Sequence, residues 1–383
     1  MQTVVTAERL WNGDASIAYP VLVMEDGKIA AMGTRAEMEI PAGAQVMDFG
    51  AATLAPAFFD VHFHGAVNHD VMEGTPEALG TIGRFLATRG TGSFLATTVT
   101  APLDATLRAL EGLAKIVEQP AVPGQAQPLG IHLEGPFLSH AKRGVHPPEL
   151  LLAPEISTFD RLYEAAGGHV KLMTLAPELP GAAELAAHAT KRGVRISIGH
   201  SDAVAAQARA VIAAGAVSAT HTFNAMRPLD HREPGILGVA LTDDGLYAEL
   251  ICDGVHTTPE MVKIWWRCKG PRRGILITDG MSATGMPDGE YHLGGFAVQV
   301  AHGRATAHGV LAGSVLTQNH ALENFVRFTG ATVEQGLGLL TANPSAMTGV
   351  ETGTLAAGLP ANLVAVDAQG RLVQSIAGGK PVS

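Results

Sequence analysis

The segment RISIGHSDAVAAQARAVIAAGAVSATH, residues 195–221, can be interpreted from end to end and indicates the fold. Residues 195–198 and 216–220 are short apolar runs that fit β-strands, and alanines repeat at helical spacing between Asp202 and Ala214. Gly215 follows this stretch, where glycine commonly ends a helix. A strand, a helix and a strand within about 25 residues predict a βαβ unit with parallel strands.

The middle of the chain continues in the same style. Apolar strand-like runs alternate with helical stretches rich in Ala, Leu and Glu, which predicts a parallel α/β architecture. A (β/α)8 barrel typically has about 250 residues, and residues 56–350 can accommodate one. We therefore predict an α/β fold with a TIM-like (β/α)8 barrel over residues 56–350.

The two chain ends have a different pattern. Short β-rich runs separated by turns lie near the N-terminus at residues 2–6, 19–24, 28–32 and 45–49. Similar runs lie near the C-terminus at residues 353–355, 362–367 and 371–374. We predict that residues 1–55 and 351–383 together form one small β-sandwich domain.

The composition of the 383 residues excludes several classes of protein. Hydrophobic residues make up 46% and charged residues 16%, which is typical of folded globular proteins and not of disordered chains. A net charge of −10 disfavours binding to nucleic acid or to anionic membranes. We therefore expect neither of these partners.

The cysteines and the N-terminal sequence bear on where in the cell the protein is located. Cys252 and Cys268 are too few for a disulfide scaffold and do not form a CxxC motif, so we interpret both as free thiols. The chain has neither a long apolar run nor the pattern of a secretory signal. We expect a cytoplasmic protein without membrane contact.

The histidines in DVHFHG, residues 60–65, are the first sign of a metal site. His62 and His64 lie two residues apart after an apolar run, so on a strand both rings project to the same side. Two imidazoles placed in this way can bind one metal ion. A chance pair among 16 histidines is the alternative explanation.

Four further apolar runs end on residues that can bind a metal ion, namely Glu134, His200, His221 and Asp279. Whole βα units can span the intervals between them, and the carboxyl ends of all barrel strands meet on one face. We therefore expect these side chains to converge with those of the HxH pair.

These motifs resemble the amidohydrolase superfamily and, within it, the N-acetylglucosamine-6-phosphate deacetylases. HLEGP, the NAM…REPG block and LAGS are far more specific to these deacetylases than HxH. The resemblance covers nearly the whole chain and is carried by DVHFHG (60–65), HLEGPFL (132–138), RGVHPPE (143–149), GHSDA (199–203), THTFNAMRPLDHREPG (220–235), DGVH (253–256), TDGMSATGMPDGEY (278–291), LAGSVLT (311–317) and ANPSAMTG (342–349).

The resemblance implies a metal centre at Glu134, His200 and His221. Some members replace the HxH histidines and bind one ion, whereas others keep both and bind two ions bridged by the glutamate. This chain keeps His62 and His64, so we expect one or two divalent ions. Imidazole and carboxylate ligands suit Zn²⁺ and Fe²⁺ comparably, so the ligands do not decide which of these metals is bound.

The resemblance also makes Asp279 the general acid–base of an amide hydrolysis. One carboxylate beside a metal can accept a proton from water and later return it to the departing amine. An N-cap at Asp279-Gly280 is the structural alternative. The implied reaction converts N-acetyl-D-glucosamine 6-phosphate and water to D-glucosamine 6-phosphate and acetate.

A sugar-phosphate pocket follows from the same resemblance. His146, with Val145 beside it, is expected to contact the acetamide carbonyl or a sugar hydroxyl. Arg232 and His256 are expected to bind the phosphate through charge-assisted hydrogen bonds. In relatives the neighbouring subunit can supply a phosphate ligand, which implies a homodimer. The sugar is expected to lie against Asn224, Ala225, Leu311, Ala312 and Gly313.

Some alternatives remain open. The substrate can be the galactosamine epimer, because loops of unknown shape decide how one sugar hydroxyl is recognised. A non-catalytic sugar-phosphate sensor is disfavoured, because it has no need of Asp279. His132, two residues before Glu134, either supports the metal site or packs in the core.

Overall fold

The structure is a computed structural model and describes residues 2–383. Its centre is a sheet of eight parallel strands, each of which pairs with the strand that follows it along the chain. In chain order the strands are β8 (Phe58–Phe63), β11 (Thr91–Thr98), β12 (Gln127–Glu134), β13 (Val170–Leu175), β14 (Arg195–Ile198), β15 (Ala216–Ala219), β16 (Tyr247–Ile251) and β17 (Gly274–Ile277).

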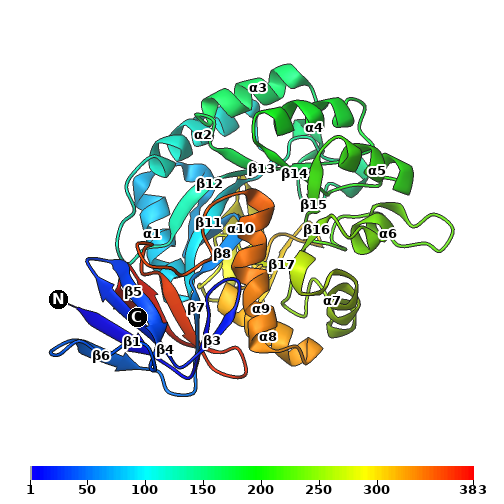
Figure 1. The fold of residues 1–383 in the computed structure, drawn as a ribbon. Coiled ribbons are helices and arrows are strands. Elements are labelled where there is room, and N and C mark those ends of the chain that lie inside the picture. Colours follow the sequence, from blue (N-terminus) through cyan, green and yellow to red (C-terminus); the bar gives the residue numbers. More distant parts are fainter. Residues whose placement is uncertain (1) are drawn as a thin grey trace.

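Helices follow the strands, and those from α1 to α7 curve round the outside of the sheet in Figure 1. Among residues 2–383, none of the helices has the length and apolarity needed to cross a membrane. They are α1 (Pro76–Thr88), α2 (Leu103–Val117), α3 (Ile156–Ala165), α4 (Ala182–Lys191), α5 (Ala205–Ala213), α6 (Gly235–Thr242), α7 (Pro259–Arg273) and α8 (Gln318–Thr329), followed by α9 (Val333–Leu340) and α10 (Ala342–Thr348).

The barrel closes where β8 meets the segment that follows β17. The backbone N–H of Asp279 donates to the carbonyl of His62 at 2.9 Å, and that of His64 donates to the carbonyl of Gly280 at 2.8 Å. The hydroxyl of Thr278 also donates to the buried carboxylate of Asp60 at 2.6 Å. The α/β barrel predicted from the sequence is therefore confirmed.

Two further sheets lie beside the barrel, and both ends of the chain lie there (Figure 1). The first is built from N-terminal strands alone, and the second combines strands from both ends. The four-stranded sheet contains β1 (Thr3–Thr6), β4 (Pro20–Glu25), β5 (Lys28–Thr34) and β6 (Gln45–Asp48). The six-stranded sheet contains β2 (Arg9–Trp11), β3 (Ser16–Ala18), β7 (Thr53–Pro56), β22 (Leu363–Val366), β23 (Leu372–Ala377) and β24 (Lys380–Val382).

One buried apolar cluster joins these two sheets. It includes Val5 and Leu22 from the first sheet and Leu54, Leu363 and Ile376 from the second. Strand β7 pairs with β22, so the two chain ends are hydrogen-bonded to each other. The proposed division into residues 1–55 with 351–383 and residues 56–350 stays a prediction.

Two details differ from the sequence predictions. Residues 353–355 do not form a strand, because Gly353 has a φ of 71° and Leu355 makes one backbone hydrogen bond, to Asn12. The helix expected from Asp202 begins only at Ala205, since the N–H of Asp202 donates to the carboxylate of Glu178.

A four-stranded antiparallel sheet between β17 and α8 was not expected from the sequence. It consists of β18 (Gly289–Leu293), β19 (Phe296–Ala301), β20 (Arg304–Ala307) and β21 (Val310–Leu311). A smaller hairpin of β9 (Gly65–Ala66) and β10 (His69–Asp70) follows β8 and leads into the 3-10 helix η1 (Val71–Glu73). Short 3-10 turns η2 (His140–Lys142) and η3 (Pro148–Leu150) follow β12.

Two helix glycines provide a matched test of this packing. A Cβ at Gly112 of α2 would lie 2.2 Å from the carbonyl oxygen of Gly74, whereas at Gly80 of α1 the nearest atom would be 3.5 Å away. Alanine normally stabilises a helix interior by about 0.5–1 kcal/mol relative to glycine. We expect Gly80→Ala to raise the urea midpoint of unfolding. Gly112→Ala should lower it, because overpacking of this kind reduces the free energy of unfolding by about 1–3 kcal/mol. Equal shifts in the two variants would contradict the close approach at Gly112.

Candidate metal centre and active site

The predicted ligands meet at the carboxyl ends of the barrel strands. Glu134 is the last residue of β12, and His62 and His64 lie at the end of β8. His200, His221 and Asp279 follow the ends of β14, β15 and β17. All six side chains are buried.

Three of these residues have the same unusual backbone geometry. The φ angles of His200, His221 and Asp279 are 46°, 28° and 53°, a left-handed region that non-glycine residues seldom adopt. Such strain is found mainly where the surrounding structure fixes a functional side chain. The turn directly after each strand thus directs its side chain to the centre of the barrel face.

Glu134 lies between the imidazole rings. Its Oε1 is 3.2 Å from His62 Nε2, 3.2 Å from His200 Nε2 and 3.1 Å from His221 Nε2, and its Oε2 is 3.2 Å from His64 Nε2. The donor atoms of Glu134, His200 and His221 are close enough together to hold one metal ion. The glutamate therefore contacts every histidine of the predicted centre.

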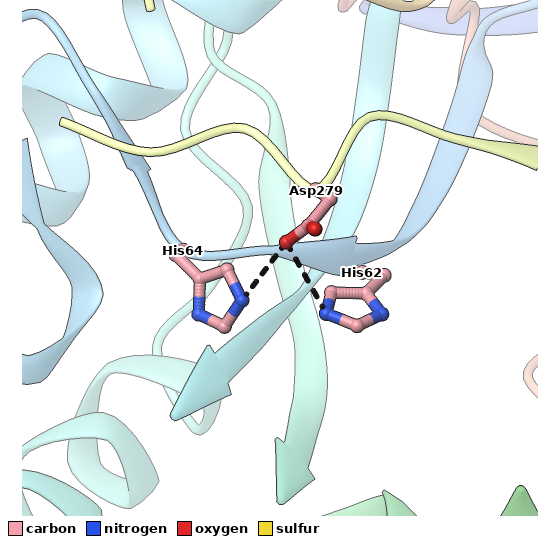
Figure 2. Close-up of side chains that lie close together, drawn as sticks. All are labelled: His62, His64 and Asp279. Carbon is pink, nitrogen blue, oxygen red and sulfur yellow. Dashed lines mark ion pairs between the residues drawn. The ribbon is translucent and has the colours of Figure 1, made fainter. Parts of the chain in front are cut away.

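A second group of possible ligands lies beside the first. Oδ1 of Asp279 is 3.5 Å from His62 Nε2 and 3.2 Å from His64 Nε2. Figure 2 shows both rings directing a nitrogen at this one carboxylate oxygen. The three side chains are close enough together to hold an ion of their own.

The hydrogen bonds of the rings fit metal ligation. His64 Nδ1 lies 2.9 Å from the carbonyl of Thr97, and His200 Nδ1 lies 2.9 Å from that of Lys142. A carbonyl only accepts, so Nδ1 carries the proton and the Nε2 lone pair is directed at the centre. His62 Nε2 is buried and makes no hydrogen bond, which also fits an atom that ligates a cation.

His146 has the opposite arrangement. The backbone N–H of Thr100 donates to His146 Nδ1 at 3.3 Å, so the proton of the neutral ring is on Nε2. Burial lowers the pKa of His146 to about 4, and the ring is therefore neutral at neutral pH. Its Nε2 lies 3.6 Å from Glu134 Oε2, so a hydrogen-bond donor faces the centre.

A pocket of about 350 Å³ opens above these residues. The insert between β17 and α8 supplies Leu293, Val310 and Leu311 to its wall. The other lining residues are His64, Glu134, Gly144, Val145, His146, His200, His221, Asn224, Ala225, His256, Asp279 and Gly313.

Two residues predicted for substrate binding lie outside this pocket. Ala312 is buried in the apolar cluster of the insert. Arg232 is exposed on the loop between β15 and α6, where its N–H donates to Asp230. His256 does line the pocket, and its Nδ1 is 2.7 Å from the carboxylate of Asp253.

Comparison with known proteins identifies the family. The model of the amidohydrolase family matches residues 53–382. This chain belongs to the amidohydrolase family. The family is metal-dependent, and this amidohydrolase has two groups of side chains suited to metal ions.

Among its relatives, an N-acetylgalactosamine-6-phosphate deacetylase from Escherichia coli O157:H7 is 39% identical over 98% of each chain. An N-acetylglucosamine-6-phosphate deacetylase from Lysinibacillus sphaericus is 36% identical over 93% of this chain and 92% of its own. A solved aspartate-to-alanine variant of the N-acetyl-D-glucosamine-6-phosphate deacetylase from Mycobacterium smegmatis, in complex with N-acetyl-D-glucosamine-6-phosphate, has a TM-score of 0.92 at 34% identity and covers 100% of this chain and 99% of its own. The resemblance predicted from the motifs is confirmed.

The sequence interpretation missed one residue of this amidohydrolase that contacts a predicted metal ligand. Glu249 of β16 is fully buried, and its Oε2 lies 3.4 Å from His62 Nδ1. A lone acidic residue inside the apolar strand YAELI was the available signal. His132, for which both alternatives were left open, is buried, hydrogen-bonds Thr174 at 2.9 Å and packs its ring edge-to-face against that of His62, with centroids 4.7 Å apart.

The position of Glu134 predicts which ions depend on it. We expect Glu134→Ala to abolish tight Zn²⁺ binding to both groups, because its carboxylate contacts all four histidines. His64→Ala is the matched variant and removes a ligand from only one group, so one ion should remain. Zinc per chain, measured by elemental analysis after dialysis, distinguishes the two. Equal zinc contents in the two variants would contradict a shared glutamate.

Proposed function

We propose that this chain hydrolyses the acetamide group of N-acetyl-D-glucosamine 6-phosphate, giving D-glucosamine 6-phosphate and acetate. The observation that carries the proposal is the position of Glu134, Asp279 and four histidines at one end of a pocket of about 350 Å³. A sugar phosphate fits a pocket of this size. Relatives that match over most of their length carry the name of this enzyme.

We propose that the pocket residues have separate tasks in the reaction. One or two divalent ions, Zn²⁺ or Fe²⁺, bound by His62, His64, Glu134, His200 and His221 would lower the pKa of water and polarise the acetyl carbonyl. Asp279 accepts a proton and returns it to the departing nitrogen.

The neighbouring side chains and backbone orient the acetyl group. Nε2–H of His146 donates to the acetyl oxygen as that oxygen gains negative charge. The sugar is proposed to lie against Asn224, Ala225, Leu311 and Gly313, which line the pocket.

The phosphate is proposed to bind between two chains. His256 reaches the pocket of its own chain, whereas Arg232 is exposed outside it. We propose a homodimer in which Arg232 of the partner subunit completes the phosphate site. A guanidinium can form paired hydrogen bonds to phosphate oxygens, which makes it suited to this task.

The galactosamine epimer is the second candidate substrate. The relative that is 39% identical is named an N-acetylgalactosamine-6-phosphate deacetylase. The chemistry at the acetamide would be the same, and only the contacts to one sugar hydroxyl would differ.

The first experiment compares substrates. We expect the metal-loaded protein to release acetate from N-acetyl-D-glucosamine 6-phosphate much faster than from unphosphorylated N-acetyl-D-glucosamine, because His256 and Arg232 contact the phosphate. Faster release from N-acetyl-D-galactosamine 6-phosphate would assign the epimer instead. No acetate from any of the three substrates would refute the deacetylase proposal.

The phosphate contact has its own control within this comparison. Arg232→Ala should raise the KM for the phosphorylated sugar by about 10-fold or more, the value of one lost charge-assisted hydrogen bond. The same variant should leave hydrolysis of the unphosphorylated sugar unchanged.

Asp279 provides the test of the acid–base step. We expect Asp279→Asn to lower kcat by about 10²–10⁴-fold, because an amide cannot accept and return the proton. Asp202→Asn is the control, since the Asp202 side chain is 41% exposed and forms only long ion pairs outside the pocket. Metal content is measured in both variants, and unchanged kcat in Asp279→Asn would remove this residue from the reaction.

A further inference from the structure

Glu249 is an unusual residue for the interior of a barrel. Its side chain has no exposed surface, yet one carboxylate oxygen, Oε1, has no hydrogen-bond partner. The other oxygen has two long contacts, 3.4 Å to His62 Nδ1 and 3.4 Å to the backbone N–H of His221. A buried carboxylate in such surroundings is costly unless a positive charge lies nearby.

No lysine or arginine among residues 2–383 forms an ion pair with this carboxylate. The nearby positions for a cation are those of the metal centre, on the far side of the His62 ring. Nδ1 of His62 faces Glu249, and Nε2 faces Glu134 and Asp279. The imidazole thus lies between the buried carboxylate and the metal-binding groups.

Other rings of the centre are oriented differently. His64 and His200 each direct Nδ1 at a neutral backbone carbonyl, and His221 Nδ1 has no partner. Only His62, among the four, directs its outer nitrogen at a carboxylate. A carboxylate in this position fixes the ring as the Nδ1–H tautomer and makes the inner nitrogen a stronger ligand.

We infer that Glu249 is a positioning residue that gives the His62, His64 and Asp279 group its affinity for a second metal ion. The inference rests on the proposed metal centre. Glu249 supports only one group through a ring nitrogen, because it faces Nδ1 of His62, whereas its contact with His221 of the other group is to the backbone N–H. Loss of Glu249 should therefore weaken one ion and leave the other in place.

The test measures Zn²⁺ binding by competition with a chromophoric chelator, without substrate. Wild-type protein is expected to bind two ions, and Glu249→Leu to bind one of them about 10–100-fold more weakly. Glu249→Gln, which keeps an acceptor but not the charge, should be intermediate. Ser218→Ala is the control, because Ser218 is equally buried on the adjacent strand β15 and its hydroxyl has no partner.

Thermal melting of the metal-free proteins separates positioning from a structural role. Removing a buried carboxylate should leave the metal-free melting temperature unchanged or raised. Equal zinc affinity in wild type and Glu249→Leu overturns the inference, as does parallel weakening of both sites with a lower metal-free melting temperature. Wild-type protein that binds no zinc would instead refute the proposed metal centre.

Discussion

The contact between the first and last strands of the barrel is the constraint on which the site depends. His62 lies in β8, His64 directly follows it, and Asp279 follows β17. These two strands are the first and the last in the order of the sheet. Backbone hydrogen bonds from Asp279 to His62 and from His64 to Gly280 bring the edges together. Closure of the sheet and assembly of one ligand group are therefore the same structural event.

Four buried carboxylates make different contacts around this closure. Asp60 ties the strands together below the site through Thr278, and Glu134 joins the two ligand groups above it. Asp279 and Glu249 lie on either side of the His62 ring. A buried acidic residue alone is expensive, and here each one has a hydroxyl, an imidazole or a possible cation beside it.

The parts added to the barrel have separate roles. The insert of β18–β21 supplies part of the pocket wall and none of the predicted metal ligands. The two terminal sheets share an apolar cluster that contains none of the pocket residues. The segments that follow the strands, this insert among them, therefore set the shape of the pocket, while the predicted metal ligands lie at the strand ends, as is usual in barrels of this kind.

The sequence by itself determined the parallel barrel and predicted the residues that gather at its strand ends, because local patterns encode both. Strand and helix periods appear within single units such as residues 195–221. A polar residue that ends an apolar strand can likewise be recognised from that one stretch of sequence, without knowledge of the neighbouring strands. The contact between Glu249 and His62 was not visible in this way, since the two residues are distant along the chain. The proton positions on His64 and His146 were equally hidden, because hydrogen bonds from other strands fix them. Only the tertiary structure decided these features, because they depend on contacts between elements far apart in sequence. The tertiary structure also placed Arg232 outside the pocket of its own chain.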